Sequence, residues 1–148
     1  MIFVDTSFFY PLFSEDDDDH ARVREVFEGF RGRQLNDLLV TTPQIVFETV
    51  TLVRLRHRQG RPDALVRHRQ AVHAGERLLS GKLARIHRPT EDEERAAFAY
   101  FKKHHDQEYS MVDCLSFVVM ETLGIREALA VDSDFTHRFV ARPGPRPS

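Results

Sequence analysis

Cysteine is nearly absent from this chain of 148 residues, and the single Cys114 cannot form an internal disulfide. A reducing compartment suits such a chain, so we expect a cytoplasmic rather than a secreted protein. No apolar run approaches the roughly 20 residues of a membrane-spanning helix, and the N-terminus lacks the basic-then-apolar plan of a signal peptide. We therefore expect no association with a membrane.

Sequence motifs for binding nucleotides and zinc are also missing. The chain has no Gly-x-x-x-x-Gly-Lys-Ser/Thr loop to hold a nucleotide, and its histidines are too scattered to form a short zinc-binding pattern. Neither repeats nor a linker of domain length divide it. Its hydrophobic fraction of 41% and charged fraction of 30% are those of a globular protein, and its length is enough for one domain with its own core.

The formal net charge of −2 does not by itself indicate a nucleic-acid partner, but the charges are segregated along the chain. Acidic residues concentrate at 15–19, at 91–94 and in the C-terminal third. The segment 54–88 instead has ten Lys and Arg side chains against only Asp63 and Glu76. Solvated helix faces explain most of these positions taken singly, whereas a phosphate-binding surface is the more specific interpretation of the basic segment.

Short apolar runs alternate with helical patterns along the chain. The runs predict strands, and apolar residues spaced by three and four between capping residues predict helices. The first helix begins just after Asp5, where Thr6 or Ser7 can cap it. The other predicted helices cover residues 21–30, 43–58, 63–79, 90–103 and 110–123, and the predicted strands cover residues 2–4, 38–41, 83–86 and 128–131.

The predicted strands lack the polar alternation of a sheet with one exposed face. Such strands are typical of a parallel sheet covered by helices on both faces. We therefore predict an α/β fold, namely a three-layer α/β/α domain of residues 1–141 with a central parallel sheet of four to five strands. Pro143, Pro145 and Pro147 predict a disordered tail at 142–148.

Acidic residues fall where such a fold binds its ligands, beyond the carboxyl ends of the strands. Asp5 directly follows the first predicted strand, and Asp132 directly follows the last. Glu48 lies on the first turns of the helix after the second strand, and Asp113 lies on the first turn of a helix that begins near Ser110. We expect these four acids to converge on one cleft.

Most of these candidate acids also have an ordinary structural explanation. Asp5 suits a turn, Asp113 a capping box, and Asp132 and Asp134 suit helix caps. Glu48 is different, because a carboxylate without a partner would be costly in the mostly apolar segment around it.

Carboxylates that converge on one cleft repel one another and raise one another's pKa unless a cation neutralises them. A divalent ion removes that repulsion. Mg²⁺ and Mn²⁺ prefer hard oxygen ligands, and Mg²⁺ keeps waters that phosphate oxygens can replace. The sequence thus favours Mg²⁺, with Mn²⁺ as a substitute, and phosphate chemistry.

Four motifs together resemble those of a known family. They are IFVDTSFFYPLF at the start, QIVFETVTLV after the second predicted strand, YSMVDCLSFVVM in the late helix and ALAVDSDF near the end. In this order and spacing the chain resembles the PIN-domain ribonucleases, in particular the VapC-like toxins of toxin–antitoxin pairs. The resemblance extends over nearly the whole chain.

The resemblance implies a metal site in which Asp5 and Asp113 contact the ion directly. Glu48, Asp132 and Asp134 would bind it through water or orient the attacking water. The hydroxyl groups of Thr6 and Ser110 would support these acids. The implied reaction is hydrolysis of an RNA phosphodiester by a metal-activated water, with the cation stabilising the charge on the phosphate.

The resemblance also implies partners, namely an RNA substrate, a cognate antitoxin that covers the site, and a second copy of the chain in a homodimer. Arg54, Arg56 and Arg58 are candidates for binding RNA phosphates, although exposure at a helix end explains them equally well. One alternative is a non-catalytic PIN-like module that binds RNA or a protein. Another is a phosphatase or DNA nuclease with the same acids.

Overall fold

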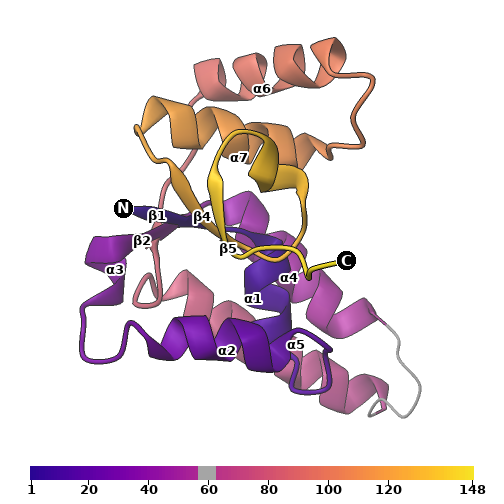
Figure 1. Cartoon of the computed structure of the whole chain (residues 1–148). Coiled ribbons are helices and arrows are strands. Elements are labelled where there is room, and N and C mark those ends of the chain that lie inside the picture. The colour runs from indigo at the N-terminus through magenta and orange to yellow at the C-terminus, as the bar shows by residue number, and fades with distance from the viewer. Residues whose placement is uncertain (57–62) are drawn as a thin grey trace.

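A computed structural model describes residues 1–56 and 63–148, so Arg58 lies outside the described residues. Within these ranges a single sheet contains five parallel strands (Figure 1), as the sequence predicts. The strands are β1 (Ile2–Val4), β2 (Leu39–Thr41), β3 (Arg85–Ile86), β4 (Glu127–Ala130) and β5 (Val140–Pro143).

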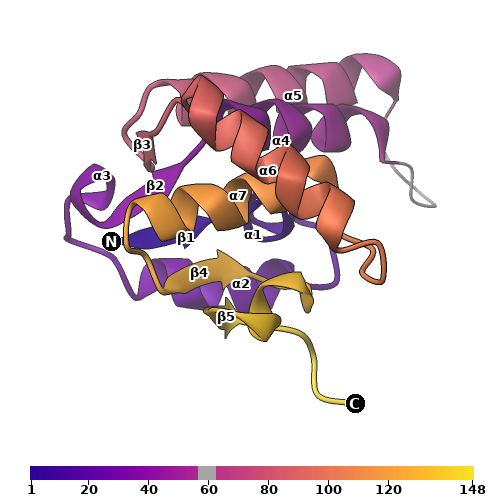
Figure 2. The same cartoon turned by 90° about the horizontal axis from the view of Figure 1, so that it is seen from above.

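Helices cover both faces of this sheet. They are α1 (Thr6–Phe13), α2 (His20–Glu28), α3 (Leu35–Leu38), α4 (Pro43–Leu55), α5 (Ala64–Leu79), α6 (Glu91–Lys103), α7 (Met111–Thr122) and the 3₁₀ helix η1 (Asp134–His137). Helices α6 and α7 lie on one face, whereas α1 and α2 lie on the other, and α4 and α5 pack against each other beside α1 (Figures 1 and 2). The predicted three layers are confirmed.

The order of the strands decides where a ligand can bind. The sheet runs β3-β2-β1-β4-β5, so β1 lies in the middle, between β2 and β4. The chain moves outward from β1 to β3 and then returns to place β4 on the other side of β1. Such a reversal opens a crevice at the carboxyl ends of the two adjacent strands, here β1 and β4.

The sheet is short, but its central strands are completely enclosed. Phe3 and Val4 of β1 and Leu129 of β4 have no exposed surface. Burial of each of these side chains contributes about 2 kcal/mol relative to exposure to water. Their enclosure by helices on both faces explains why the strands have no polar alternation.

The C-terminal segment corrects the predicted domain boundary. Strand β5, which the sequence did not predict, pairs Arg142 with Leu129 and Pro143 with Ala130, and the N–H of Gly144 donates to the carbonyl of Ala130 at 2.9 Å. The prediction of a disordered tail from residue 142 is therefore wrong for these residues. Backbone pairing with β4 orders them, and proline is tolerated in a strand at the edge of a sheet.

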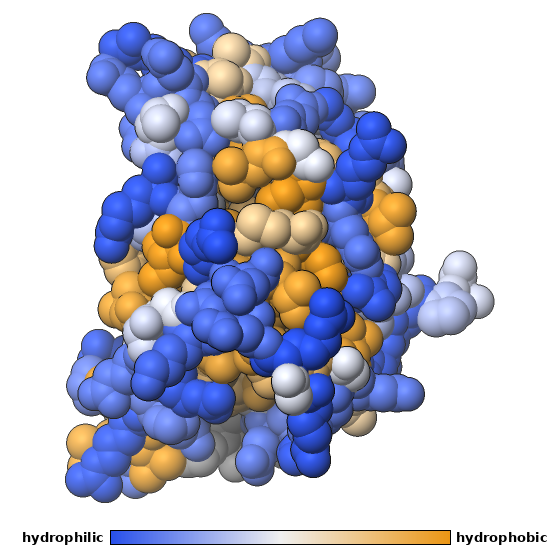
Figure 3. Space-filling view, turned by 90° about the vertical axis from the view of Figure 1, so that its left-hand side faces the viewer, coloured by the Kyte–Doolittle hydropathy of each residue, from blue (hydrophilic) through white to orange (hydrophobic). Residues whose placement is uncertain are grey.

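Apolar side chains gather on the face that carries the amino end of β1 (Figure 3). Met1 is 50% exposed and Leu123 is 41% exposed, and both line a shallow hollow with Val40 and Ile86. Met1 precedes β1 and Leu123 precedes β4, so this surface lies at the end of the strands away from the crevice. In the ranges that the structure describes, no helix has both the length and the apolar composition needed to cross a membrane.

Candidate active site

A cavity of about 340 Å³ opens at the carboxyl ends of β1 and β4, where the strand order predicts a ligand site. Four of the five predicted acids line it, together with Thr6. The lining residues are Asp5, Thr6, Ser7, Tyr10, Pro11, Asp17, Asp19, Glu48, Leu52, Arg56, Asp113, Val131 and Asp132.

Asp5 is placed by the junction between β1 and α1. It is 2% exposed, and its side chain accepts a hydrogen bond from the N–H of Ser7 at 3.0 Å. Asp5 is thus the N-cap of α1, and the predicted cap at Thr6 or Ser7 is wrong. The reason is that helical backbone begins at Thr6, which leaves the extended residue before it to cap.

Ser7 joins the two strand ends that carry acids. Its hydroxyl accepts a hydrogen bond from the N–H of Val131 at 3.0 Å, and Val131 immediately precedes Asp132. This bond joins residues 124 positions apart in the sequence, and it holds the start of α1 against the end of β4. Ser7 therefore positions Asp132 relative to Asp5, a role that its sequence context did not reveal.

Asp113 is placed by the capping box that begins α7, as predicted. The hydroxyl of Ser110 accepts from the N–H of Asp113 at 3.0 Å, and the Asp113 carboxylate accepts from the N–H of Ser110 at 2.9 Å. Ser110 does not line the cavity itself but orients a carboxylate that does. The capping explanation and the functional one are thus compatible, because one carboxylate serves both.

Asp132 and Asp134 follow β4 in a tight turn. The Asp132 carboxylate accepts a hydrogen bond from the N–H of Asp134 at 3.3 Å, and η1 begins at Asp134. Asp132 lines the cavity, but Asp134 does not. Asp134 still acts on the site electrostatically, because its charge raises the pKa of both Asp113 and Asp132.

Glu48 belongs to one face of α4. Glu48 and Leu52 are four residues apart on that face, and Arg56, the C-cap four residues further on, continues the row; all three line the cavity. Phe47 is 59% exposed, so the apolar surroundings expected for Glu48 are only partly present. Arg54 is exposed and does not line the cavity.

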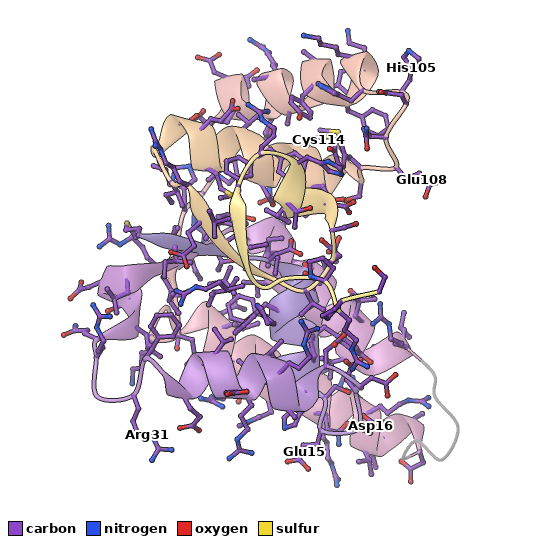
Figure 4. All side chains as sticks on the ribbon, viewed as in Figure 1. Glu15, Asp16, Arg31, His105, Glu108 and Cys114 are labelled. Atoms are coloured by element: carbon purple, nitrogen blue, oxygen red, sulfur yellow. The ribbon has the colours of Figure 1, made fainter. Side chains whose placement is uncertain are left out.

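The loop between α1 and α2 contributes acids that sequence reasoning did not assign to the site. Asp17 and Asp19 line the cavity, whereas Glu15 and Asp16 are exposed at the outer edge of the molecule (Figure 4). Asp19 forms ion pairs with Arg22 at 3.0 Å and with Arg146 at 2.9 Å, and these two arginines lower its pKa. The run of acids at 15–19 was visible in the sequence, but its distance from the site was not.

The environment of the cavity disfavours the ionised form of three of its acids. Burial, and then the charges of Asp132 and Asp113, raise the pKa of Asp5 from 3.8 to about 8. Burial and the charges of Asp134 and Asp132 raise the pKa of Asp113 to about 6, and burial with Asp134 and Glu48 raises that of Asp132 to about 6. Such shifts are expected where carboxylates are buried close to one another.

The donor set fits a hard divalent cation. Every candidate ligand is an oxygen, and Thr6 Oγ1 is buried at the cavity with no hydrogen-bond partner among the described residues. Within 1–56 and 63–148, no three His, Cys, Asp or Glu side chains are grouped closely enough to enclose an ion. Mg²⁺ commonly needs only one or two carboxylates and keeps several waters, so two carboxylates such as those of Asp5 and Asp113 would be enough to hold it.

Comparisons with known proteins agree with this geometry. The family model described as PIN domain matches residues 2–138. Two curated relatives, each named 23S rRNA-specific endonuclease VapC20, come from two strains of Mycobacterium tuberculosis and are 35% identical over 136 residues, which is 92% of this chain and 92% of each relative. The crystal structure of M. tuberculosis VapC20, described as a Sarcin-Ricin loop cleaving toxin, superposes with a TM-score of 0.77 at 32% identity and covers 93% of this chain and 94% of that chain.

Proposed function

Because the chain belongs to the PIN domain family, whose model matches residues 2–138, we propose that it is a metal-dependent endoribonuclease and the toxin of a toxin–antitoxin pair. The observation that carries the proposal is the cavity at the carboxyl ends of β1 and β4, where Asp5, Glu48, Asp113 and Asp132 converge. Three of these four carboxylates have a raised pKa, which is typical of a functional site.

Asp5 and Asp113 are the proposed ligands of the ion, which is Mg²⁺ or, as a substitute, Mn²⁺. When bound, the ion would neutralise the carboxylates, polarise the phosphate and acidify a bound water. Ser7 holds the Asp5 and Asp132 segments together through the N–H of Val131, and Ser110 fixes the Asp113 carboxylate by the capping box.

Asp132 and Glu48 are the proposed acceptors for the proton of the attacking water. Both line the cavity, and Asp132 accepts the N–H of Asp134 through only one of its two carboxylate oxygens. The raised pKa of Asp132, about 6, suits a carboxylate that takes a proton near neutral pH. Burial, and then the negative charge of Asp134 outside the cavity, raise this pKa.

We propose ribosomal RNA with a structured loop as the substrate class, because the VapC20 relatives are 23S rRNA-specific endonucleases and one is described as cleaving the Sarcin-Ricin loop. A cognate antitoxin is the proposed inhibitor. A homodimer and a cytoplasmic location stay predictions.

The decisive experiment is an RNA cleavage assay with the purified protein. The substrates are a hairpin RNA that contains the sarcin–ricin loop, an unstructured RNA and a DNA copy of the hairpin, each with Mg²⁺, Mn²⁺ or EDTA. We expect metal-dependent cleavage of the RNA hairpin and a loss of at least about 100-fold in kcat in Asp113→Asn, since a positioned acid–base or ligand group contributes that much.

Asp92→Asn is the matched control. Asp92 and Asp113 both lie in the first turn of a helix, α6 and α7 respectively, but Asp92 is exposed and does not line the cavity. The control variant should cleave at the wild-type rate. Binding of the hairpin without turnover in any metal would instead favour a non-catalytic module, and faster cleavage of the DNA copy would favour a DNA nuclease. Parental activity in Asp113→Asn would make the site assignment wrong.

A further inference from the structure

Arg56 places a positive charge in a cavity that is otherwise acidic. It follows Glu48 and Leu52 of α4 at a spacing of four, as the C-cap of that helix, and all three line the cavity. Arg54 lies two residues earlier, which is about 200° around the helix, and so it faces elsewhere. Of the arginines at the end of α4 within the described residues, Arg56 is the one that reaches the site.

The side chain of Arg56 is held on an aromatic platform. Its Cζ lies 4.3 Å from the centroid of the Tyr10 ring, a cation–π contact between α4 and α1. Tyr10 is 2% exposed and packs in a small core with Val53, Ala71 and Ala74. Because that core spans α1, α4 and α5, the ring cannot move without disturbing three helices, and it fixes the base on which the guanidinium rests.

The donors of this guanidinium are not taken up by the acids of the cavity. Arg56 forms no ion pair with any carboxylate among the described residues, although Glu48 lies two turns away on the same face of α4. A guanidinium that stacks on a ring with one face still presents its N–H groups at its edge. That planar edge matches the geometry of a phosphate, to which it can donate two parallel hydrogen bonds.

A phosphate that binds in this cavity requires a positively charged group beside the acids. The charged residues that line the cavity are all acids apart from Arg56, and carboxylates repel a phosphate wherever no cation lies between them. A cation at Asp5 and Asp113 can neutralise only its own surroundings. A neighbouring phosphate of a nucleic-acid strand that passes along α4 would meet Arg56 at the edge of the same cavity.

We propose that Arg56 binds a phosphate of the RNA strand next to the scissile bond, and that Tyr10 is the positioning residue that holds it there. This assignment rests on the proposed ribonuclease function and adds to it the group that binds the strand. It predicts that Arg56 contributes to binding of the substrate and to its salt dependence, and that Tyr10 acts on binding only through Arg56.

Binding is best measured on the Asp113→Asn background in EDTA, so that the RNA stays intact. The probe is the hairpin RNA with the sarcin–ricin loop, titrated over a series of salt concentrations. We expect Arg56→Ala to weaken binding by about 10-fold. The plot of the logarithm of the binding constant against the logarithm of the salt concentration has a negative slope, and its magnitude should decrease by about 0.7 to 0.9, the value for one lost phosphate contact. Arg54→Ala removes the same charge from the same helix outside the cavity, and we expect a loss of at most about twofold.

Tyr10 is tested with two substitutions and a double-mutant cycle. Tyr10→Phe keeps the aromatic ring and should bind RNA as the parent protein does, whereas Tyr10→Leu should weaken binding almost as much as Arg56→Ala. In the double variant Tyr10→Leu/Arg56→Ala, the two losses should not add, because they remove one interaction. A merely structural role for Tyr10 would give additive losses, and circular dichroism identifies any variant that does not fold.

The cleavage assay with the wild-type protein separates failure of this assignment from failure of the ribonuclease proposal. If the wild-type protein cleaves RNA while Arg56→Ala and Arg54→Ala bind and cleave alike, Arg56 is not the phosphate-binding group and the ribonuclease proposal stands. If the wild-type protein cleaves no RNA under any condition, the ribonuclease proposal and the assignment that rests on it both fail. Additive losses with Tyr10→Leu overturn the positioning role of Tyr10.

Discussion

At the scale of single residues, Asp5 combines a structural and a chemical task. Its carboxylate caps α1 through the N–H of Ser7 and also faces the cavity. Capping stabilises the ionised form, but burial and the neighbouring acids have the larger effect and raise its pKa to about 8. Without a cation, the native protein therefore favours Asp5 in its protonated form near neutral pH.

This pKa predicts how the stability of the metal-free protein depends on pH. The unfolded chain releases the Asp5 proton near pH 3.8, whereas the folded chain keeps it until about pH 8. The folded state binds more protons in that window, so its stability falls as the pH rises through it. Asp5→Asn removes the charge and keeps an oxygen that can accept from Ser7.

We therefore expect Asp5→Asn to abolish cleavage and yet to stabilise the metal-free protein at pH 8 by about 1 kcal/mol or more, with a smaller gain at pH 5. Thermal unfolding in EDTA at both pH values measures this, and Mg²⁺ should raise the Tm of the wild-type protein more than that of the variant. Asp92→Asn is the control, because it removes an exposed carboxylate that does not line the cavity. A variant less stable than the wild-type protein at pH 8 would contradict the electrostatic account.

At the scale of the elements, two helices begin with the same local structure. Ser110 and Asp113 form a capping box at α7, and Thr90 and Glu93 form one at α6. Both were predictable from sequence, because a capping box needs only residues three apart. Of the two boxes, the one at α7 contains a residue that lines the cavity, Asp113, and that difference depends on where the fold places each helix.

The two boxes allow a matched test of whether Ser110 positions Asp113. Ser110→Ala and Thr90→Ala each remove one N-cap hydroxyl, and each should lower the free energy of unfolding by about 1 kcal/mol. Ser110→Ala should in addition lower cleavage by about 10-fold, because the Asp113 carboxylate loses the partner that orients it, whereas Thr90→Ala should not. Chemical denaturation and the cleavage assay measure the two effects, and equal activity of both variants would exclude a positioning role.

At the scale of the whole molecule, the C-terminal segment completes the sheet. Strand β5 adds backbone hydrogen bonds to β4, and beyond it Gly144 donates to Ala130 while Arg146 contacts Asp19 in the loop at the cavity. Surface ion pairs such as the one between Arg146 and Asp19 contribute little, but the strand pairing is continuous with the core. The end of the domain therefore lies beyond the predicted residue 141.

Two truncations test this boundary. A chain that ends at Ala141 loses the pairing of Arg142 and Pro143 and the hydrogen bond from Gly144, and we expect a decrease of at least about 2 kcal/mol in the free energy of unfolding. A chain that ends at Gly144 keeps these contacts and should lose less than about 1 kcal/mol, since it loses only the contacts of the exposed Arg146 with Asp18 and Asp19. Urea denaturation measures both, and equal stabilities would restore the predicted boundary.

The sequence by itself determined the alternation of strands and helices, the parallel sheet and the strand ends on which Asp5 and Asp132 lie, because apolar runs and helix caps act over a few neighbouring residues. Only the tertiary structure decided which other groups share the cavity. Ser7 bonds to Val131 across 124 positions, Arg56 rests on Tyr10 from another helix, and β5 is ordered by pairing with β4. Such contacts depend on how distant segments pack, and no local pattern in the sequence encodes them.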